Sequence, residues 1–169
     1  MLNGAGLNQP FLPGWLYCRE EMHHWDCHFY ANRFWHPVAA VTALRPGQTL
    51  AITLLLQPLL LTWPKGSRPR AFRDRCPHRG VAFQADADTA TSRRRLICPY
   101  HGWTYNLDGT LQSAARESGF KNGFDRQAWG LSELPCAIEG PFIWVALTEG
   151  AIPLEQQLAL IQSLSLIHI

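Results

Sequence analysis

Short apolar runs alternate with proline and glycine through the middle of the chain, from residue 34 to residue 111. Runs of this length that are bounded by turn-forming residues are typical of antiparallel strands. Residues 52–56 and 59–63 are predicted to be two buried strands that join at Gln57-Pro58. The pattern therefore predicts an all-β body.

Three other segments depart from this pattern or resume it. Residues 15–32 are rich in aromatic and polar side chains, and we interpret them as one helix. Residues 114–126 are polar and contain two glycines, so we expect a loop before strands return at 134–147. Residues 153–161 carry leucine and isoleucine at helical spacing, which predicts a second helix near the C-terminus.

Length and composition limit the function classes. At 169 residues, 47% hydrophobic and 17% charged, the chain can bury one modest core. Its most apolar stretch, residues 50–63, falls short of the ~20 apolar residues that a membrane-spanning helix needs. A net charge of +2 argues against a nucleic-acid partner. The N-terminus lacks the order of a signal peptide, and five cysteines argue against a disulfide scaffold, so we expect a reducing cytoplasm.

Two short clusters carry the chemistry: Cys76-Pro77-His78-Arg79-Gly80 and Cys98-Pro99-Tyr100-His101-Gly102-Trp103. Each brings one thiolate and one imidazole to a predicted chain reversal. A Cys-x-His pair followed by a Cys-x-x-His pair matches the ligand rule of a Rieske 2Fe-2S centre, where two cysteines hold one iron and two histidines the other. We therefore predict that Cys76 and Cys98 bind the inner iron. His78 and His101 would bind the outer one, in a site that transfers electrons.

The residues between the ligands fit this hypothesis. Gly80 and Gly102 would let the backbone turn sharply and bring N–H groups towards the sulfurs. A proline follows each ligand cysteine and stiffens its loop. A structural zinc site could use the same side chains, but zinc fingers usually open with Cys-x(2-4)-Cys and close with two histidines. A zinc-stabilised interaction module is therefore a distant alternative.

At these residues the chain resembles the Rieske domain of Rieske-type non-haem iron oxygenases, the large component of ring-hydroxylating and demethylating oxygenases. The likeness covers about residues 30–150 and includes further motifs: Phe34-Trp35-His36-Pro37-Val38, Leu44-Arg45-Pro46-Gly47, the run 102–111 and Gly140-Pro141-Phe142-Ile143-Trp144-Val145. It implies an open antiparallel barrel with a two-loop cluster-binding subdomain at one end, after a short N-terminal helix. One departure is the 19-residue spacing between His78 and Cys98, with extra length expected at 85–95.

The resemblance also implies how such a domain works. Rieske proteins of respiratory and photosynthetic complexes have a further cysteine in each cluster loop, and the two form a disulfide. Here those positions hold other residues, so we expect a cluster of low potential. In the family, a reductase or ferredoxin donates electrons, which pass to a mononuclear iron in a neighbouring subunit of a homo-oligomer.

The mononuclear iron of the family is held by two histidines and a carboxylate. Residues 114–163 contain no histidine, so they cannot supply such a triad. We therefore expect no catalytic residue in this chain, and we expect mononuclear Fe(II) only in a further, C-terminal domain. The substrate stays open for the same reason.

The last six residues, 164–169, correspond to the translation of a transposon-end sequence used in sequencing libraries, and we interpret them as adapter read-through. A natural apolar tail is the alternative. The sequence then divides into a leader (1–32), a Rieske domain (33–150), the beginning of a truncated catalytic domain (151–163) and the adapter translation. The main functional alternative is a free-standing Rieske ferredoxin, against which the leader and the tail argue.

Two further groups invite a functional interpretation. Five residues of the N-terminal segment look like a metal cluster: His23, His24, Asp26, Cys27 and His28. They meet no complete spacing rule, so packing or solvation on a helix is preferred. Nine of the fifteen basic residues lie between 65 and 95, with Arg93-Arg94-Arg95 close to the second ligand loop in sequence. We prefer a solvated hairpin there over a docking face for an acidic electron donor.

Overall fold

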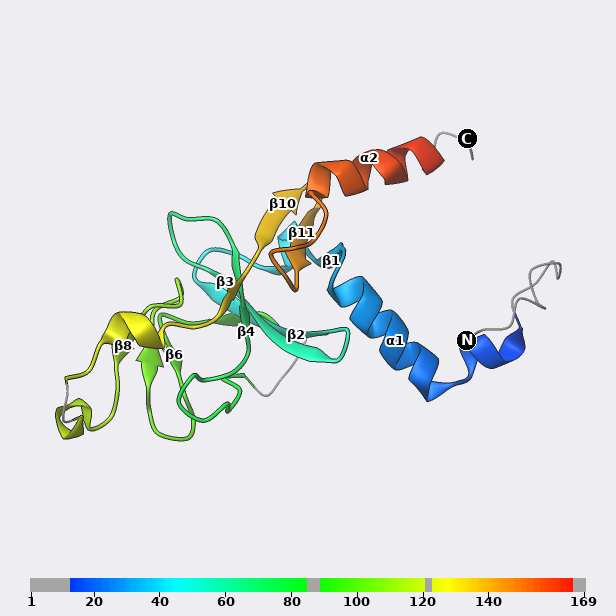
Figure 1. Ribbon diagram of the computed structural model, residues 1–169. Coiled ribbons are helices and arrows are strands. Elements are labelled where there is room, and N and C mark those ends of the chain that lie inside the picture. The colour runs from blue at the N-terminus through cyan, green and yellow to red at the C-terminus, as the bar shows by residue number, and fades with distance from the viewer. Residues whose placement is uncertain (1–12, 85–88, 121–122, 166–169) are drawn as a thin grey trace.

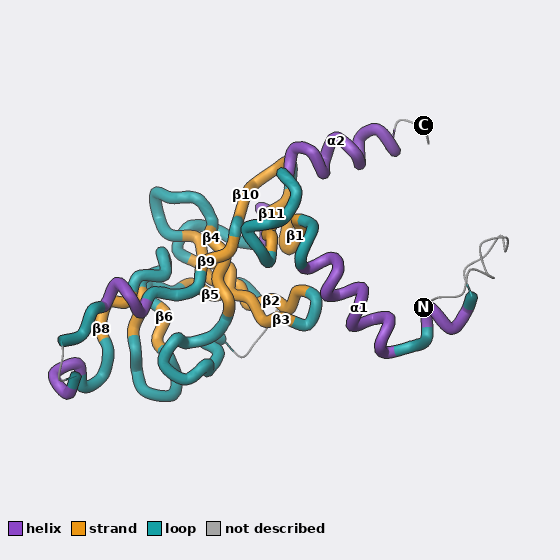
Figure 2. The backbone as a smooth tube through the Cα atoms, viewed as in Figure 1, coloured by secondary structure: helices purple, strands orange, loops and turns teal. Residues whose placement is uncertain are grey.

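The computed structural model describes residues 13–84, 89–120 and 123–165 (Figures 1 and 2). Its strands, in chain order, are β1 Trp35–Ala40, β2 Gln48–Leu54, β3 Gln57–Trp63, β4 Arg70–Arg73, β5 Thr91–Ser92, β6 Leu96–Ile97, β7 Thr104–Tyr105, β8 Leu111–Ser113, β9 Glu133–Leu134, β10 Cys136–Glu139 and β11 Phe142–Ala146. The helices are α1 Glu20–Ala31 and α2 Leu154–Ser165, with short 3-10 turns at Gly14–Tyr17, Val41–Ala43, Glu117–Gly119 and Arg126–Trp129. No helix among the described residues is long and apolar enough to cross a membrane.

Three open antiparallel sheets make up the described β body. Their strand orders are β1-β11-β10, β5-β2-β3-β4-β9 and β6-β7-β8. The prediction of an all-β body with an N-terminal helix is confirmed. The described residues of 114–126 contain no strand, as expected, although single 3-10 turns interrupt the loop.

The β2–β3 hairpin turns at a different place from the one predicted. Leu54 pairs with Gln57, so Leu55 and Leu56 form the two-residue turn, with φ values of 46° and 67°. Positive φ at both central residues is the geometry whose twist matches the flanking strands. Pro58 lies inside β3 instead, opposite Thr53 and outside the segment that pairs with β4. The prediction of a turn at Gln57-Pro58 was therefore wrong.

The N-terminal segment is also divided, contrary to the prediction of one helix over 15–32. A 3-10 turn ends at Tyr17, and α1 begins at Glu20 after an extended Arg19 (ψ 127°). Glu20 and Glu21 occupy the first turn of α1, where carboxylates interact favourably with the helix N-terminus. The acidic pair explains why the regular helix begins here.

The five-stranded sheet is the middle layer between two hydrophobic cores. Successive side chains of a strand point to opposite faces. Leu59 and Leu61 of β3 join Ile143 and Val145 of β11 in one core, whereas Leu60 joins the core that surrounds the β6–β8 sheet. All five side chains are fully buried. The alternation in β3 thus couples the β1-β11-β10 sheet on one side to the β6–β8 sheet on the other.

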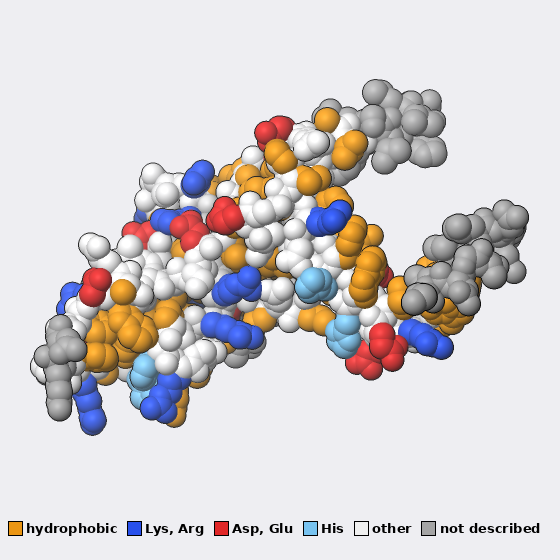
Figure 3. All heavy atoms as spheres, in the orientation of Figure 1, with side chains coloured by type: hydrophobic (Ala, Val, Ile, Leu, Met, Phe, Trp, Pro, Cys, Tyr) orange, Lys and Arg blue, Asp and Glu red, His pale blue; other side chains and the backbone are white. Residues whose placement is uncertain are grey.

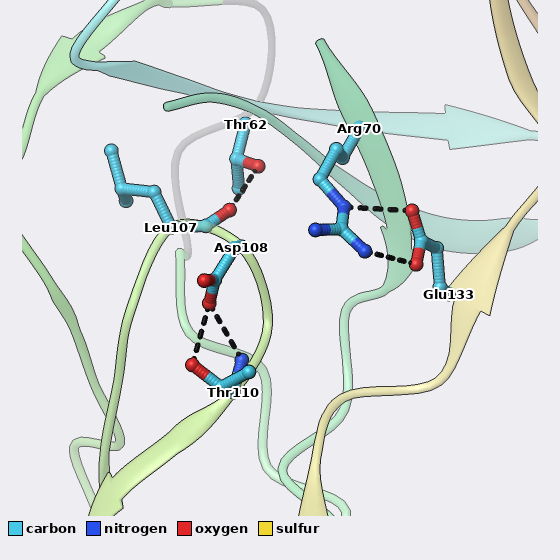
Figure 4. Close-up of polar contacts among 6 residues, drawn as sticks. All are labelled: Thr62, Arg70, Leu107, Asp108, Thr110 and Glu133. Carbon is cyan, nitrogen blue, oxygen red and sulfur yellow. Dashed lines mark hydrogen bonds and ion pairs between the residues drawn. The ribbon is translucent and has the colours of Figure 1, made fainter. Parts of the chain in front are cut away.

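A buried hydrogen bond also joins the middle sheet to the β6–β8 sheet (Figure 4). The hydroxyl of Thr62, a fully buried residue of β3, donates to the carbonyl of Leu107 in the β7–β8 turn at 2.6 Å. In the same view, Arg70 of β4 forms a two-pronged ion pair with Glu133 of β9. The Thr62 bond positions the hairpin that follows the second cysteine loop.

The two helices extend from the end of the body where β1, β10 and β11 lie, away from β6 and β8 (Figure 1). The side-chain amide of Gln157 on α2 accepts from the N–H of Trp35 at 2.9 Å and donates to its carbonyl at 2.8 Å. The helix predicted at 153–161 is confirmed and extends to Ser165. Of the expected adapter translation, residues 166–169 lie outside the described residues.

Candidate metal centre

The first cysteine loop, residues 76–81, is closed by its own backbone. The N–H of Cys76 donates to the carbonyl of Val81 at 2.8 Å, and the N–H of Gly80 donates to the carbonyl of Cys76 at 2.7 Å. Gly80 has φ +71°, a conformation that costs a residue with a side chain ~1–2 kcal/mol. The predicted chain reversal is confirmed, with glycine where the backbone requires it.

The second loop repeats this frame with the same offsets. The N–H of Cys98 donates to the carbonyl of Trp103 at 2.8 Å, and the N–H of Gly102 (φ +70°) donates to the carbonyl of Cys98 at 3.0 Å. The only difference in the ligand pattern is that His78 stands two residues after its cysteine, whereas His101 stands three after. The same backbone turn therefore carries its histidine at the second position after the cysteine in one loop and at the third in the other.

The two thiols lie inside the protein and adjoin each other. Cys76 is 1% exposed and Cys98 3% exposed, and both belong to the core around the β6–β8 sheet. The Cys76 sulfur lies 3.7 Å from the hydroxyl of the buried Tyr105 and faces the backbone N–H of His78. The groups that can donate to the Cys76 sulfur are thus the N–H of His78 and the hydroxyl of Tyr105. A backbone N–H thus approaches a sulfur in the first loop, as expected from the sharp turn, while the N–H groups of Gly80 and Gly102 themselves donate to carbonyl oxygens.

The two imidazoles lie on the solvent side of the thiols. The Nδ1 atoms of His78 and His101 are 3.2 Å apart, and the ring centroids are 4.8 Å apart. Both side chains are partly exposed and line a hollow of about 470 Å³, together with Trp103, Arg116 and Phe120. Figure 3 shows histidine at the surface at the end of the molecule where β6 and β8 lie, and also near α1. The pair of imidazole rings is therefore reachable from outside.

Burial and neighbouring charges set the protonation states. Burial raises the pKa of the Cys76 thiol, and the adjoining Cys98 raises it further, while the N–H of His78 and the Tyr105 hydroxyl oppose the shift. Desolvation, with His78 and Arg79 nearby, lowers the pKa of His101. Metal binding to such a set would release thiol protons and find His101 neutral, the form that coordinates.

An aromatic cluster supports the imidazoles from within. The indole of Trp103 lies parallel to the His78 ring and packs edge-on against Trp129 and Phe124. On the outer side, Tyr100 lies against His101, with ring centroids 3.7 Å apart. Sequence reasoning did not identify Phe124 or Trp129, because they come from a distant loop without a motif.

A buried carboxylate fixes the segment that leaves the first loop. Asp74 is 2% exposed, and it accepts hydrogen bonds from the backbone N–H groups of Phe83 (2.7 Å) and Gln84. Its own N–H donates to the carbonyl of Pro58 at 3.1 Å. Burial raises the pKa of the Asp74 carboxyl, and the two N–H donors oppose that shift. Asp74 is a positioning residue that the sequence analysis missed.

The other residues singled out in the sequence lie away from these loops. His23 and Cys27 are one turn apart on α1, with the Cys27 sulfur 3.7 Å from Nε2 of His23. Cys18 is exposed and Cys136 half-buried, and burial raises the pKa of the Cys136 thiol to about 11. Within the described ranges, no three His, Cys, Asp or Glu side chains surround a single ion position.

The arginines at 93–95 lie at the far end of the hairpin from the second loop, not beside it. In the β6–β7 pairing, Leu96 lies opposite Tyr105 and Ile97 opposite Thr104, so the loop 98–103 closes one end of the ladder. Arg93 precedes the other end, and its N–H donates to the carbonyl of Gly47 at 2.9 Å. Proximity in sequence to Cys98 was misleading here.

The donor set fits a two-iron cluster with two protein ligands on each iron. Two adjoining buried thiols face inward, and two adjoining imidazoles face outward, which is the mixed ligation of a Rieske centre. Residues 34–123 match the family described as the Rieske [2Fe-2S] domain. The chain belongs to this family. The family implies a 2Fe-2S cluster, while the roles of Cys76, His78, Cys98 and His101 stay a prediction from spacing and geometry.

Sequence relatives of this Rieske domain include an oxygenase subunit and a demethylase. The glycine betaine monooxygenase oxygenase subunit of Pseudomonas aeruginosa is 29% identical over 158 residues, which cover 92% of this chain and 34% of that protein. The methylxanthine N1-demethylase NdmA of Pseudomonas putida is 39% identical over 88 residues, or 49% of this chain and 24% of the relative. The chain thus spans about a third or less of the length of these curated relatives. The predicted resemblance to Rieske oxygenases is confirmed.

Solved structures agree with the fold. The quaternary ammonium Rieske monooxygenase CntA, in complex with gamma-butyrobetaine, superposes with a TM-score of 0.78 at 25% identity, over 87% of this chain and 42% of that one. A naphthalene 1,2-dioxygenase from Rhodococcus superposes with a TM-score of 0.74 at 22% identity, over 82% and 32% of the two chains. The predicted Rieske-type fold is therefore confirmed.

Proposed function

We propose that this chain is the electron-transfer domain of a Rieske oxygenase large subunit, with Cys76, Cys98, His78 and His101 as the ligands of its 2Fe-2S cluster. The observation that carries the proposal is the repeated loop frame, which places two thiols in the core and two imidazoles at the surface. When bound, such a cluster accepts and releases one electron at a time.

The protein residues divide the work between the two sides of the site. Burial of Cys76 and Cys98 keeps water from the sulfurs, and the Cys76 sulfur has N–H and O–H neighbours in His78 and Tyr105. His78 and His101 form the solvent-facing edge, which is where an electron donor and an acceptor must approach. Trp103 holds the plane of the His78 ring, so the edge keeps one orientation.

The whole protein would be a mono- or dioxygenase in the cytoplasm, with this domain at 33–150 and a catalytic domain that begins at about 151–163. A reductase or ferredoxin would supply electrons. A mononuclear Fe(II) in the catalytic domain would receive them, across subunits of a homo-oligomer. The structure of CntA, a relative, is described in terms of inter-subunit electron transfer, which supports this arrangement.

A free-standing Rieske ferredoxin is the alternative from another class. One observation favours the oxygenase subunit: the alignment with the glycine betaine monooxygenase subunit runs over 158 residues and therefore extends beyond the family match at 34–123. It takes in sequence on both sides of the domain, where α1 and α2 lie. A carrier that shared only the cluster domain would match over the shorter range.

The ligand assignment can be tested by reconstitution under anaerobic, iron- and sulfide-replete conditions. We expect two irons and two sulfides per chain, and an electron paramagnetic resonance signal from the reduced mixed-ligand cluster. His78→Ala and His101→Ala should abolish this signal. The matched control is His28→Ala on α1, an exposed histidine away from the loops, which should keep it.

Two outcomes would contradict the assignment. A stoichiometric zinc protein without sulfide would favour the zinc-stabilised module, and loss of iron in the His28 variant would move the site to the N-terminal segment. The reduction potential offers an independent check. Because no loop disulfide is available, it should lie near the low end of the Rieske range, about −150 mV, whereas about +300 mV would indicate the respiratory class.

The oxygenase assignment can be tested in the genome. The reading frame should continue past codon 163 for roughly two hundred residues, the size of one further domain, with two histidines and a carboxylate for the iron. The codons for 164–169 should be absent. A genomic stop codon directly after Ile169 would favour the ferredoxin and leave the cluster assignment untouched.

A further inference from the structure

A basic cavity lies where the middle sheet meets the hairpin that carries the second cysteine loop. Its volume is about 520 Å³, and its lining includes Gly47, Lys65, Arg93, Arg94, Asn106 and Asp108. A second hollow of about 350 Å³ adjoins it and shares the first four of these residues. Small-molecule sites in proteins typically span about 300–1,000 Å³. The cavity is therefore of a size that binds small ligands.

Backbone hydrogen bonds fix the walls of this cavity. The N–H of Gly47 donates to the carbonyl of Trp63 at 2.6 Å, and the carbonyl of Gly47 accepts from Arg93. Gly47 has φ +87°, and a Cβ there would lie 3.1 Å from the Lys65 side chain. Glycine thus leaves room for Lys65 beside the backbone. The opposite wall is the β7–β8 turn, which Thr62 holds through Leu107.

The charges of the lining are unbalanced. Lys65, Arg93 and Arg94 contribute three positive charges, against one carboxylate, Asp108. Figure 4 shows that carboxylate turned to Thr110, from which it accepts the N–H (3.0 Å) and the hydroxyl (2.6 Å). These hydrogen bonds and the neighbouring Arg70 hold the pKa of Asp108 below its ordinary value. The carboxylate therefore has partners of its own.

One donor in the cavity wall lacks an acceptor. The Nε atom of Arg93 is buried, and it has no hydrogen-bond partner among the described residues. A buried polar group without a partner costs ~1–3 kcal/mol, and more when it is charged. Most such groups in folded proteins are satisfied by protein, water or ligand. The Arg93 side chain lines the cavity, so its guanidinium can donate to an oxyanion held there.

We propose that this cavity binds a phosphate group, with Lys65, Arg93 and Arg94 as its cationic ligands. Arginine and lysine are the residues that proteins use to hold phosphate oxygens, and arginine can do so through two parallel hydrogen bonds. Three cationic side chains balance the charge of a phosphate, which carries about two negative charges, better than that of a ligand with one carboxylate. The group can come from inorganic phosphate or from a phosphorylated small molecule.

The position of the cavity indicates what the ligand would do. It lies at the end of the β6–β7 ladder remote from the loop 98–103, so an occupant would not cover the imidazole edge. A bound phosphate would instead contact both the segment at Gly47 and the two arginines, Arg93 and Arg94, that precede β6. Phosphate binding should therefore brace the ligand hairpin against the middle sheet and stabilise the folded chain.

The test is isothermal titration of the chain as purified, together with its thermal unfolding midpoint, at constant ionic strength. Inorganic phosphate and ADP are the probes, and acetate and chloride the reference anions. We expect saturable binding of at least one phosphate compound and a midpoint that rises with its concentration. Arg93→Gln and Lys65→Gln should each weaken binding by about tenfold or more, as expected for a lost charge-assisted hydrogen bond.

Arg95→Gln is the matched control, because it removes the same charge from an exposed residue that does not line the cavity. It should change the dissociation constant by less than about twofold. Tighter binding of ADP than of phosphate would identify a phosphorylated small molecule as the source, and equal binding the free ion. If Arg93→Gln fails to fold, Arg93→Lys takes its place and should weaken binding while keeping the charge.

Equal weakening by all three glutamine variants would overturn the proposal, since a diffuse basic surface would then explain the binding. So would a midpoint that responds equally to acetate, chloride and phosphate. The readouts need no iron and no electron donor, so they do not depend on the function proposed above. Failure here would leave that function standing.

Discussion

The indole of Trp103 and the imidazole of His78 are stacked, with ring planes 1° apart and centroids 4.7 Å apart. Trp103 is 2% exposed, so this contact extends the core directly to a side chain at the surface. The two residues belong to different loops, and each loop is closed by its own backbone bonds. The stack therefore fixes the loops relative to each other.

Trp103→Ala should lower the free energy of unfolding by about 3–5 kcal/mol, because it opens a large cavity in a packed aromatic cluster. Urea denaturation followed by circular dichroism measures the change. The control is Trp25→Ala on α1, where the indole is 59% exposed, and a change within about 0.5 kcal/mol is expected. Similar losses for the two variants would show that Trp103 is not packed as described.

Gly80→Ala and Gly102→Ala should each cost about 1–2 kcal/mol, the strain of a side chain at positive φ. An added Cβ would meet nothing within 4 Å at either position, so strain alone acts. Gly109→Ala should cost more, because its Cβ would also overlap the ring of Phe72. Thermal or urea unfolding of the three variants would give this order. Gly119→Ala, with open space and no positive φ, should be nearly neutral and serves as the control.

Thr62→Val should destabilise the protein by about 1–3 kcal/mol, because the carbonyl of Leu107 loses its buried donor while the shape of the side chain is kept. The exposed Thr53 of β2 provides the matched change, and Thr53→Val should be nearly neutral. Amide hydrogen exchange adds a local readout. We expect faster exchange in the β7–β8 turn of the Thr62 variant than in the wild-type protein. An equal increase throughout the chain would contradict the conclusion that this bond connects the turn to the middle sheet.

His36→Gln should change how stability depends on pH. Burial lowers the pKa of His36 below 6.5, although its ring N–H contact with the carbonyl of Tyr30 opposes the shift. The folded state therefore binds fewer protons than the unfolded state, and stability is present above pH 6.5 and lost as pH falls through the lowered pKa.

Urea midpoints measured from pH 8 to pH 5 would test this. The wild-type protein should lose stability relative to the His36→Gln variant as the solution is acidified. Between pH 7.5 and pH 8, where His36 is neutral in both states, the difference should be constant and acts as the internal control. If the difference in stability between the two proteins were constant from pH 8 to pH 5, His36 would have the same pKa in the folded and unfolded states.

The features that could be predicted from the sequence were those set by local spacing. Cys76 and Cys98 with glycine four residues later specify the two loops, because the turn depends on residues within six positions. The hairpin turn at Leu55 and Leu56 could not be predicted in this way. Proline suggested a turn at Pro58, but the register between β2 and β3 is set by burial on both faces of the middle sheet.

Long-range packing accounts for the other misses. Trp129 reaches Trp103 across a loop that carries no motif, so only the folded chain shows the contact. Asp74 looks like an ordinary charged residue until the backbone of Phe83 returns to it. The arginines at 93–95 are near Cys98 in sequence, but a strand separates them in space.

Each cysteine loop is closed by its own backbone hydrogen bonds, so the chain reversal itself does not require a histidine side chain. Substitutions at the second or third position after the cysteine can alter metal chemistry while the backbone bonds that close each loop are kept. Other ligand sets can therefore arise on this pair of loops while each chain reversal is kept. The same separation makes the loops a module for engineering, in which His78 and His101 can be exchanged for other donors while the chain reversal persists.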